Sequence, residues 1–194
     1  MKNIKLSPHF KLYEFCNTSR GANVIQANRE FASKEENLKK LSLLSNKVLE
    51  PIRAELIKKE NNFNCRFLTI TSGVRTSGTK IANASATSQH NHCEACDFVV
   101  DGSLSNTKRL YELIKDRKIK DLKYDYISQA ILERKKRANG TYSAWIHIAI
   151  KTDRFVKQRR AANRNCKDFP EFFISLDGYK YVICNEQNLK KYLE

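Results

Sequence analysis

The 194-residue chain carries 36 Lys and Arg against 21 Asp and Glu, a formal net charge of +15, and 41% of its residues are hydrophobic. It has no apolar run of about 18 residues, and its basic amino terminus lacks the apolar core of a secretory signal, so we expect neither a membrane span nor secretion by a signal peptide. The composition favours one domain made in a cytoplasm, with a surface attracted to nucleic acid, anionic lipid or anionic cell-wall polymers.

Residues 35–59 are predicted to form a helix, because their apolar residues recur at helical spacing. These residues are Leu38, Leu41, Val48, Ile52 and Leu56. Ser33 is the expected N-cap, with Glu36 completing a capping box. Pro51 should kink this helix or restart it, since proline removes a backbone donor and clashes with the preceding turn.

A strand is predicted at 65–71, followed by a turn-rich loop and a polar stretch that ends at Gln89. A second, buried strand is expected at 97–101. The apolar spacing of residues 103–118 predicts a helix, with Ser105 as its candidate cap.

Two further strands are expected at 124–133 and 141–150, joined through the hairpin signal Asn139-Gly140. A second hairpin is expected at 171–183 around Asp177-Gly178, after a basic and partly helical segment.

The fold class that follows is α+β, a small antiparallel sheet flanked by helices with a C-terminal β-hairpin extension. We expect residues 1–150 to form one domain. Residues 151–194 would be a basic linker and a hairpin extension packed on that domain.

The stretch SQHNHCEACDFVV, residues 88–100, concentrates side chains that bind metals. One interpretation is a closed zinc knuckle made by His90 or His92 with Cys93 and Cys96, but a knuckle needs a second ligand pair at similar spacing. Another is a nuclease of the His-Asn-His type, because those letters occur at 90–92 and the chain is basic. That family draws its residues from a larger ββα unit, of which no second half is visible.

A third interpretation joins His90 and Asp97 to a ligand on a distant strand, for which His147 is the natural choice. Strand alternation puts His147 on one face with Trp145, and the neighbouring isoleucines on the other. Taken alone, a histidine in that position is more often a satisfied sheet residue than a metal ligand.

The surrounding motifs resemble those of the zinc D-alanyl-D-alanine carboxypeptidases and their phage endolysin relatives, which have the hedgehog/DD-peptidase fold. The resemblance covers roughly residues 6–150, in order. SQHNHCEACD resembles the family's SxHxxGxAxD signature, ITSGVRT its ITSGYRS segment, and AWIHIAI its closing WVHVS-like strand. Three other segments, LSPHFKLYEF, NLKKLSLLSNKVLEPIR and SQAILE, are similar to the branch found in phages and mobile elements.

The resemblance implies the zinc ligands and the catalytic residues. It implies zinc ligands at His90, Asp97 and His147. Arg75 matches the arginine that meets the substrate's carboxylate or neighbouring polar groups, and Glu133 matches a glutamate that serves as the candidate general base. Supporting positions are matched by Ser88 and Gln129.

Three positions depart from the family pattern. Cys93 replaces the signature glycine, so a positive φ there would be strained and its thiolate would be near enough to close the site. Cys96 replaces a small residue before the aspartate. Ala144 stands where some branches carry an acidic residue, which leaves the base role to Glu133, with Asp125 in reserve.

The register of the hairpin between the strands at 124–133 and 141–150 decides whether Glu133 can act as the general base. A two-residue loop would place it opposite Ile146, facing away from His147, and a three-residue loop from Asn139 to Thr141 would place it opposite His147. The proposed base role requires the second register, or a bulge with the same effect.

The expected function is hydrolysis of a peptide bond in the peptidoglycan stem peptide, by a D-Ala-D-Ala carboxypeptidase or an endolysin-type endopeptidase encoded by a phage or mobile element. Such a protein acts on the bacterial wall after release, or is carried in a virion. The alternatives are a non-catalytic wall-binding or virion protein that keeps the fold, and a basic nucleic-acid-binding protein or nuclease.

Overall fold

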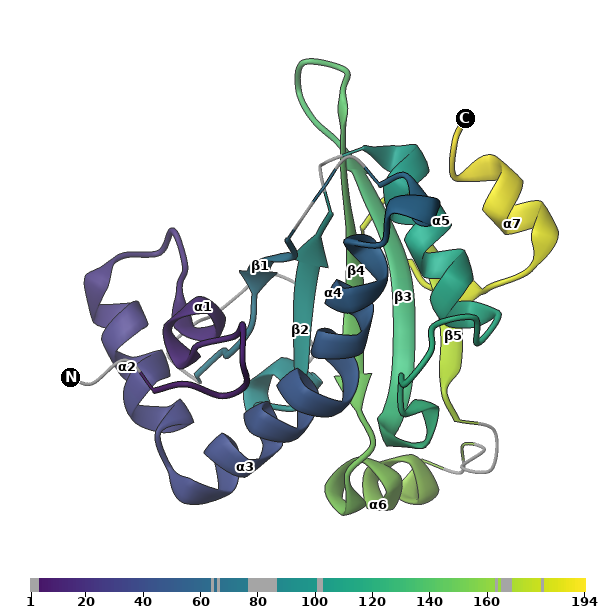
Figure 1. Cartoon of the computed structure of the whole chain (residues 1–194). Coiled ribbons are helices and arrows are strands. Elements are labelled where there is room, and N and C mark those ends of the chain that lie inside the picture. Colours follow the sequence, from purple (N-terminus) through teal and green to yellow (C-terminus); the bar gives the residue numbers. More distant parts are fainter. Residues whose placement is uncertain are drawn as a thin grey trace.

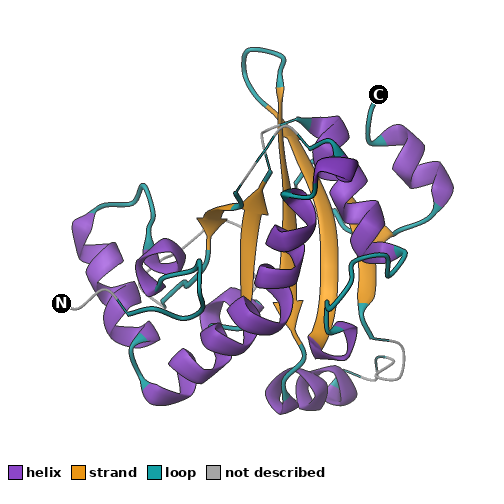
Figure 2. Ribbon diagram, in the orientation of Figure 1, coloured by secondary structure: helices purple, strands orange, loops and turns teal. Residues whose placement is uncertain are grey.

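The computed structural model describes residues 4–63, 65, 67–76, 87–100, 103–162, 164, 169–178 and 180–194. Most of the predicted polar stretch before Gln89, residues 77–86, lies outside these ranges. The chain is α+β, with a mixed six-stranded sheet in the order β1-β2-β4-β3-β5-β6 and helices flanking it (Figures 1 and 2).

The strands are β1 Thr69–Ser72, β2 Ala95–Val99, β3 Ile127–Lys136, β4 Tyr142–Ile150, β5 Glu171–Ser175 and β6 Val182–Ile183. The α-helices are α1 Leu12–Cys16, α2 Ala22–Ala32, α3 Glu35–Leu44, α4 Glu50–Leu56, α5 Leu104–Lys115, α6 Asp153–Ala161 and α7 Glu186–Lys191. The short helical turns are η1 Ser45–Leu49, η2 Lys59–Asn61, η3 Gln89–His92 and η4 Tyr124–Tyr126.

The prediction of an antiparallel sheet is wrong in one place, because β5 pairs with β3 in parallel. The reason is the path of α6, which lies at the foot of the sheet in Figure 1. It carries the chain from the end of β4 past the beginning of β3, so β5 starts at the same end as β3. The predicted second hairpin is present, since β6 pairs with β5 antiparallel.

The two faces of the sheet have different compositions because successive side chains of a strand alternate. One face packs against α3 and α5 and carries the hydrophobic core (Figure 1). Its strand residues are fully or almost fully buried, and they include Phe98, Ala130, Leu132, Ile146 and Ile148. The opposite face carries the polar residues of β2, β3 and β4, and the candidate site lies there.

The predicted helix over residues 35–59 consists of α3, the π-helical turn η1 and α4. Pro51 stands in the first turn of α4, directly after η1, where its missing N–H costs little. The helical backbone continues from α3 through η1 into α4, so the helix does not restart at Pro51. The predicted capping box is wrong, because Ser33 ends α2 and Lys34 precedes α3. The predicted cap Ser105 is also wrong. Helix α5 begins at Leu104, and the hydroxyl of Ser103 accepts the cap hydrogen bond from the Asn106 N–H.

The segment after residue 150 makes specific contacts with the preceding part of the chain. The Tyr111 hydroxyl donates to the Phe173 carbonyl at 2.9 Å, and the Tyr192 hydroxyl donates to the Glu133 carbonyl at 2.9 Å. In the described part of the chain, no helix has the length and apolar character needed to cross a membrane.

Candidate metal centre

Three side chains of the polar face converge at one point. Asp97 on β2 and His147 on β4 are directly opposite each other in the antiparallel pairing. His90 comes from η3, the turn that leads into β2. All three are buried, with exposed fractions of 2% for His90 and 8% for the other two.

The ligand atoms form a tight triangle. His90 Nε2 lies 3.1 Å from Asp97 Oδ1 and 3.1 Å from His147 Nδ1, and His147 Nδ1 lies 2.8 Å from Asp97 Oδ1. In a tetrahedral zinc site with bonds of 2.0–2.1 Å, ligand atoms are separated by about 3.3 Å. The triangle is within a few tenths of an ångström of these separations, so the group could hold a metal ion.

The orientation of His90 is fixed by a backbone partner. Its Nδ1 lies 2.6 Å from the Gly73 carbonyl oxygen. A carbonyl only accepts, so Nδ1 carries the proton and Nε2 presents its lone pair to the triangle. Gly73 must be glycine, because a Cβ there would lie 2.4 Å from the Phe15 carbonyl oxygen.

Asp97 is held in its charged form. Burial alone would raise the pKa of its carboxyl, but His90 and His147 together hold that pKa well below the usual range. Arg75 adds a hydrogen bond from its guanidinium to Asp97 Oδ2 at 3.2 Å, and the same nitrogen contacts the Ser72 hydroxyl at 3.0 Å. Arg75 thus orients a ligand carboxylate, besides lining the cavity described below.

The cysteines of the motif do not join the metal group. Cys93 has φ 57° and ψ 33°, the left-handed conformation that the signature glycine suggests. Its side chain lies in the hydrophobic core and is not one of the three that converge, and burial raises the pKa of its thiol to about 12. Cys96 points to the core face of β2, opposite to Asp97. The closed knuckle is therefore not formed by these residues.

Glu133 lies on the same face of the sheet as His147, but neither register considered from the sequence is correct. Glu133 is opposite Trp145, and Ile131 is opposite His147. The hairpin closes where the Arg137 N–H donates to the Thr141 carbonyl at 2.7 Å. This register differs by two residues from the one that pairs Glu133 with His147, so the face is kept.

The Glu133 carboxyl has an unusual environment. The residue is 5% exposed. Burial, with the nearby negative charge of Asp97, raises its pKa to about 7. The side chains of Trp145 and Tyr181 approach its carboxylate as hydrogen-bonding partners. A carboxyl with a pKa near neutrality exchanges protons readily at physiological pH.

The remaining predicted residues fall into two groups. Ser88 and Gln129 line the same cavity as Glu133. Asp125, the reserve base, is exposed in η4 and does not line it. Sequence reasoning missed Gln89, whose amide donates to the Ile150 carbonyl at 2.9 Å and whose oxygen accepts from Ser128 at 3.1 Å, which braces the His90 turn.

The three converging side chains lie in a cavity of about 750 Å³. Its walls include Arg75, Glu133 and Trp145, and also residues from the segment after residue 150, which sequence reasoning did not connect with the site. The latter are Phe155, Gln158, Arg159, Arg164, Phe173, Gly178 and Tyr181.

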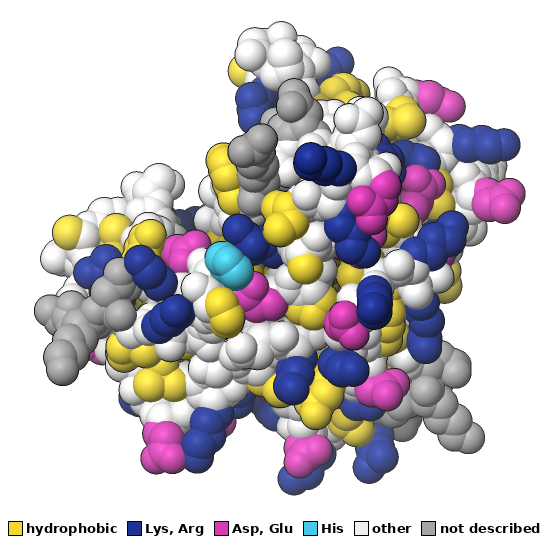
Figure 3. Space-filling view, in the orientation of Figure 1, with side chains coloured by type: hydrophobic (Ala, Val, Ile, Leu, Met, Phe, Trp, Pro, Cys, Tyr) yellow, Lys and Arg dark blue, Asp and Glu magenta, His cyan; other side chains and the backbone are white. Residues whose placement is uncertain are grey.

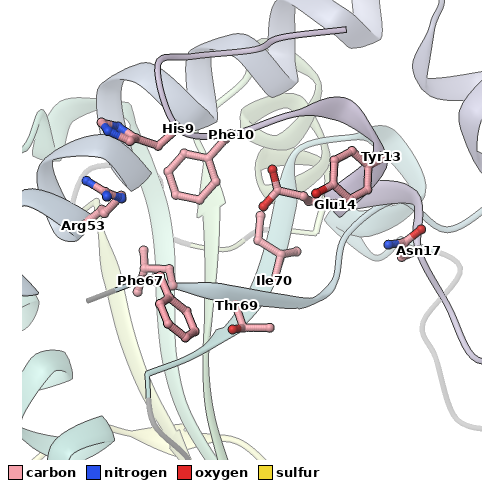
Figure 4. A pocket seen from close by; sticks show the side chains of 10 residues that line it. His9, Phe10, Tyr13, Glu14, Asn17, Arg53, Phe67, Thr69 and Ile70 are labelled. Carbon is pink, nitrogen blue, oxygen red and sulfur yellow. The ribbon is translucent and has the colours of Figure 1, made fainter. Parts of the chain in front are cut away.

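Figure 4 shows a second cavity, of about 450 Å³, bordered by α1, α4 and the edge strand β1. Its one imidazole, His9, is paired with Glu50 at 2.8 Å. The metal-ligating group found among the described residues lies in the larger cavity.

Comparison of the chain with protein-family models, with curated proteins and with solved structures found no match.

Proposed function

We propose that the protein is a zinc-dependent peptidase that hydrolyses a peptide bond in the peptidoglycan stem peptide. One observation carries this proposal: His90, Asp97 and His147 converge in a cavity that also contains the buried carboxyl of Glu133. Three ligands with a cavity beside them match a catalytic zinc site, whereas a structural site is closed by four protein ligands.

Zinc fits the donor set better than a harder cation. Two imidazole nitrogens and one carboxylate oxygen are a common zinc set, whereas calcium and magnesium prefer all-oxygen surroundings. Two of the three ligands are already oriented, His90 by the Gly73 carbonyl and Asp97 by Arg75. Such outer contacts tighten metal binding because less reorganisation is needed.

When bound, zinc supplies Lewis acidity towards a carbonyl group and water. Glu133 accepts one proton from the attacking water, and the same proton is delivered to the amine nitrogen of the leaving group. Arg75 remains the residue for a carboxylate of the stem peptide, because its guanidinium lines the cavity.

The site also bears on the nuclease alternative. His92 shares η3 with His90 but is not part of the metal group, so the HNH tripeptide does not act as one unit. In Figure 3, Lys and Arg side chains are spread over the visible face with Asp and Glu among them. The charge of +15 fits attraction to anionic wall polymers after release from a cell or delivery by a virion.

The decisive experiment combines metal analysis with digestion of isolated cell walls. We expect about one zinc per chain, and muropeptides shortened at a defined stem-peptide bond in mass spectra. Glu133→Gln should retain zinc and release no fragment. Intact walls after treatment with zinc-loaded protein would refute the peptidase and favour the non-catalytic binding module. Tight DNA binding that weakens steeply with salt would favour the nucleic-acid alternative.

A further inference from the structure

The segment from residue 151 onwards forms one side of the metal cavity. Its lining residues come from α6, β5 and the connection between β5 and β6, and they include Phe155, Phe173 and Tyr181. In Figure 1, α6 lies at the foot of the sheet and β5 runs beside β3. The family resemblance ends at residue 150, so it assigns no role to these residues.

Buried contacts fix this segment relative to the site. Glu94, which is fully buried just before β2, accepts hydrogen bonds from Arg154 Nε at 2.8 Å and from the Thr152 hydroxyl at 2.9 Å. At the other end, the Tyr192 hydroxyl binds the backbone carbonyl of Glu133. The segment is therefore held against both the metal-ligand strand and the strand of the candidate base.

Strand register brings Tyr181 into the row of Glu133. Glu133 is opposite Ser175 in the β3–β5 pairing, and Ile174 is opposite Val182 in the β5–β6 pairing. Continuing the second pairing by one residue places Tyr181 opposite Ser175. Opposite residues of neighbouring strands project from the same face of a sheet.

The separation suits the two side chains. Two strand spacings amount to about 9.6 Å, which a tyrosine and a glutamate span together. Between them stands Ser175, whose small side chain leaves room. Tyr181 and Glu133 line the same cavity, so the register and the shared cavity wall bring the tyrosine hydroxyl within reach of the Glu133 carboxylate.

We propose that Tyr181 is a positioning residue, whose hydroxyl holds the Glu133 carboxylate against Trp145 and towards the metal ligands. Trp145 is opposite Glu133 on β4, so the carboxylate is bracketed by one partner from each neighbouring side. This inference rests on the proposed function, and it gives the C-terminal segment a part in the reaction.

The first measurement compares Tyr181→Phe with the wild-type protein, and uses Tyr126→Phe as the control. Tyr126 is 40% exposed and lies outside the cavity lining. We expect Tyr181→Phe to bind zinc with unchanged affinity and to lower kcat about tenfold or more, with KM unchanged, because a hydrogen bond to a charged group is lost. A kcat equal to that of Tyr126→Phe would overturn the proposal.

The second measurement needs no activity. Urea unfolding of the zinc-free wild type, Tyr181→Phe, Glu133→Leu and the double variant at pH 8 gives the coupling between the two side chains. We expect the effects on the unfolding equilibrium constant to depart from multiplicativity by about tenfold. Purely multiplicative effects would refute the positioning contact. Coupling in a protein that cuts no wall peptide would instead refute the peptidase while the contact stands.

Discussion

Replacing Glu133 by glutamine should stabilise the metal-free protein at alkaline pH while abolishing hydrolysis. The carboxyl is 5% exposed, and burial together with Asp97 raises its pKa from 4.5 to about 7. Glutamine has nearly the same shape and keeps an oxygen to accept from Trp145 and Tyr181. It carries no charge, so it avoids the cost of ionising a buried carboxyl.

The magnitude follows from proton linkage. Each unit of pKa corresponds to 1.36 kcal/mol, so the difference between 4.5 and about 7 amounts to about 3 kcal/mol. Because the folded-state pKa is raised, the contribution of Glu133 to stability is fully present below pH 4.5 and is lost as pH rises towards 7. The stabilisation by Glu133→Gln should thus be about 3 kcal/mol at pH 8 and about 1 kcal/mol at pH 5.

Urea unfolding of the zinc-free proteins at the two pH values tests this directly. Glu112→Gln is the matched control, because Glu112 is a half-buried surface partner of Lys108 on α5. Its effect should change little between pH 5 and pH 8. A Glu133→Gln effect that is equal at both pH values would refute the raised pKa, and with it the reasoning that makes Glu133 the base.

His147→Ala should weaken zinc binding by more than about a hundredfold in calorimetric titration, whereas His92→Ala should leave it unchanged; similar affinities would remove His147 from the ligand set. Gly73→Ala should destabilise the fold by about 2 kcal/mol or more in urea unfolding, because the new Cβ meets the Phe15 backbone at 2.4 Å. Cys93→Gly should leave zinc affinity within about twofold, since the thiol lies in the core; a large loss of affinity would show that sulfur is a ligand.

The three converging residues were predicted from the sequence, but only the face of the strand on which each side chain lies is a local property. Strand alternation determines that Asp97 and Cys96 point to opposite faces, and the same rule separates His147 from its isoleucine neighbours. Which two strands pair is not a local property. The family resemblance, rather than periodicity, is what predicts that Asp97 and His147 lie side by side.

The errors in strand pairing have a common cause. The register and direction of a pairing depend on contacts between distant segments, which the periodicity of the sequence does not encode. The β3–β4 register depends on where the Arg137–Thr141 hydrogen bond closes the hairpin, and Asn139-Gly140 fixes only its neighbourhood. The parallel pairing of β5 depends on the path of α6. No sequence pattern indicated Tyr181, for the same reason. Its position beside Glu133 depends on two pairings, that of β3 with β5 and that of β5 with β6.

The sheet separates stability from chemistry by its two faces. On β4, Ile146 and Ile148 are fully buried in the core, and each contributes about 1.5–3 kcal/mol by burial. His147, between them, faces the cavity with Asp97 and Glu133, where burial of charge opposes folding. Because alternation keeps the two sets apart, the core face can offset the cost of an ionisable cavity without touching its geometry. A core substitution such as Ile146→Val should therefore lower stability and leave zinc affinity unchanged, whereas inserting or deleting one residue within β4 would exchange its two faces and remove both together.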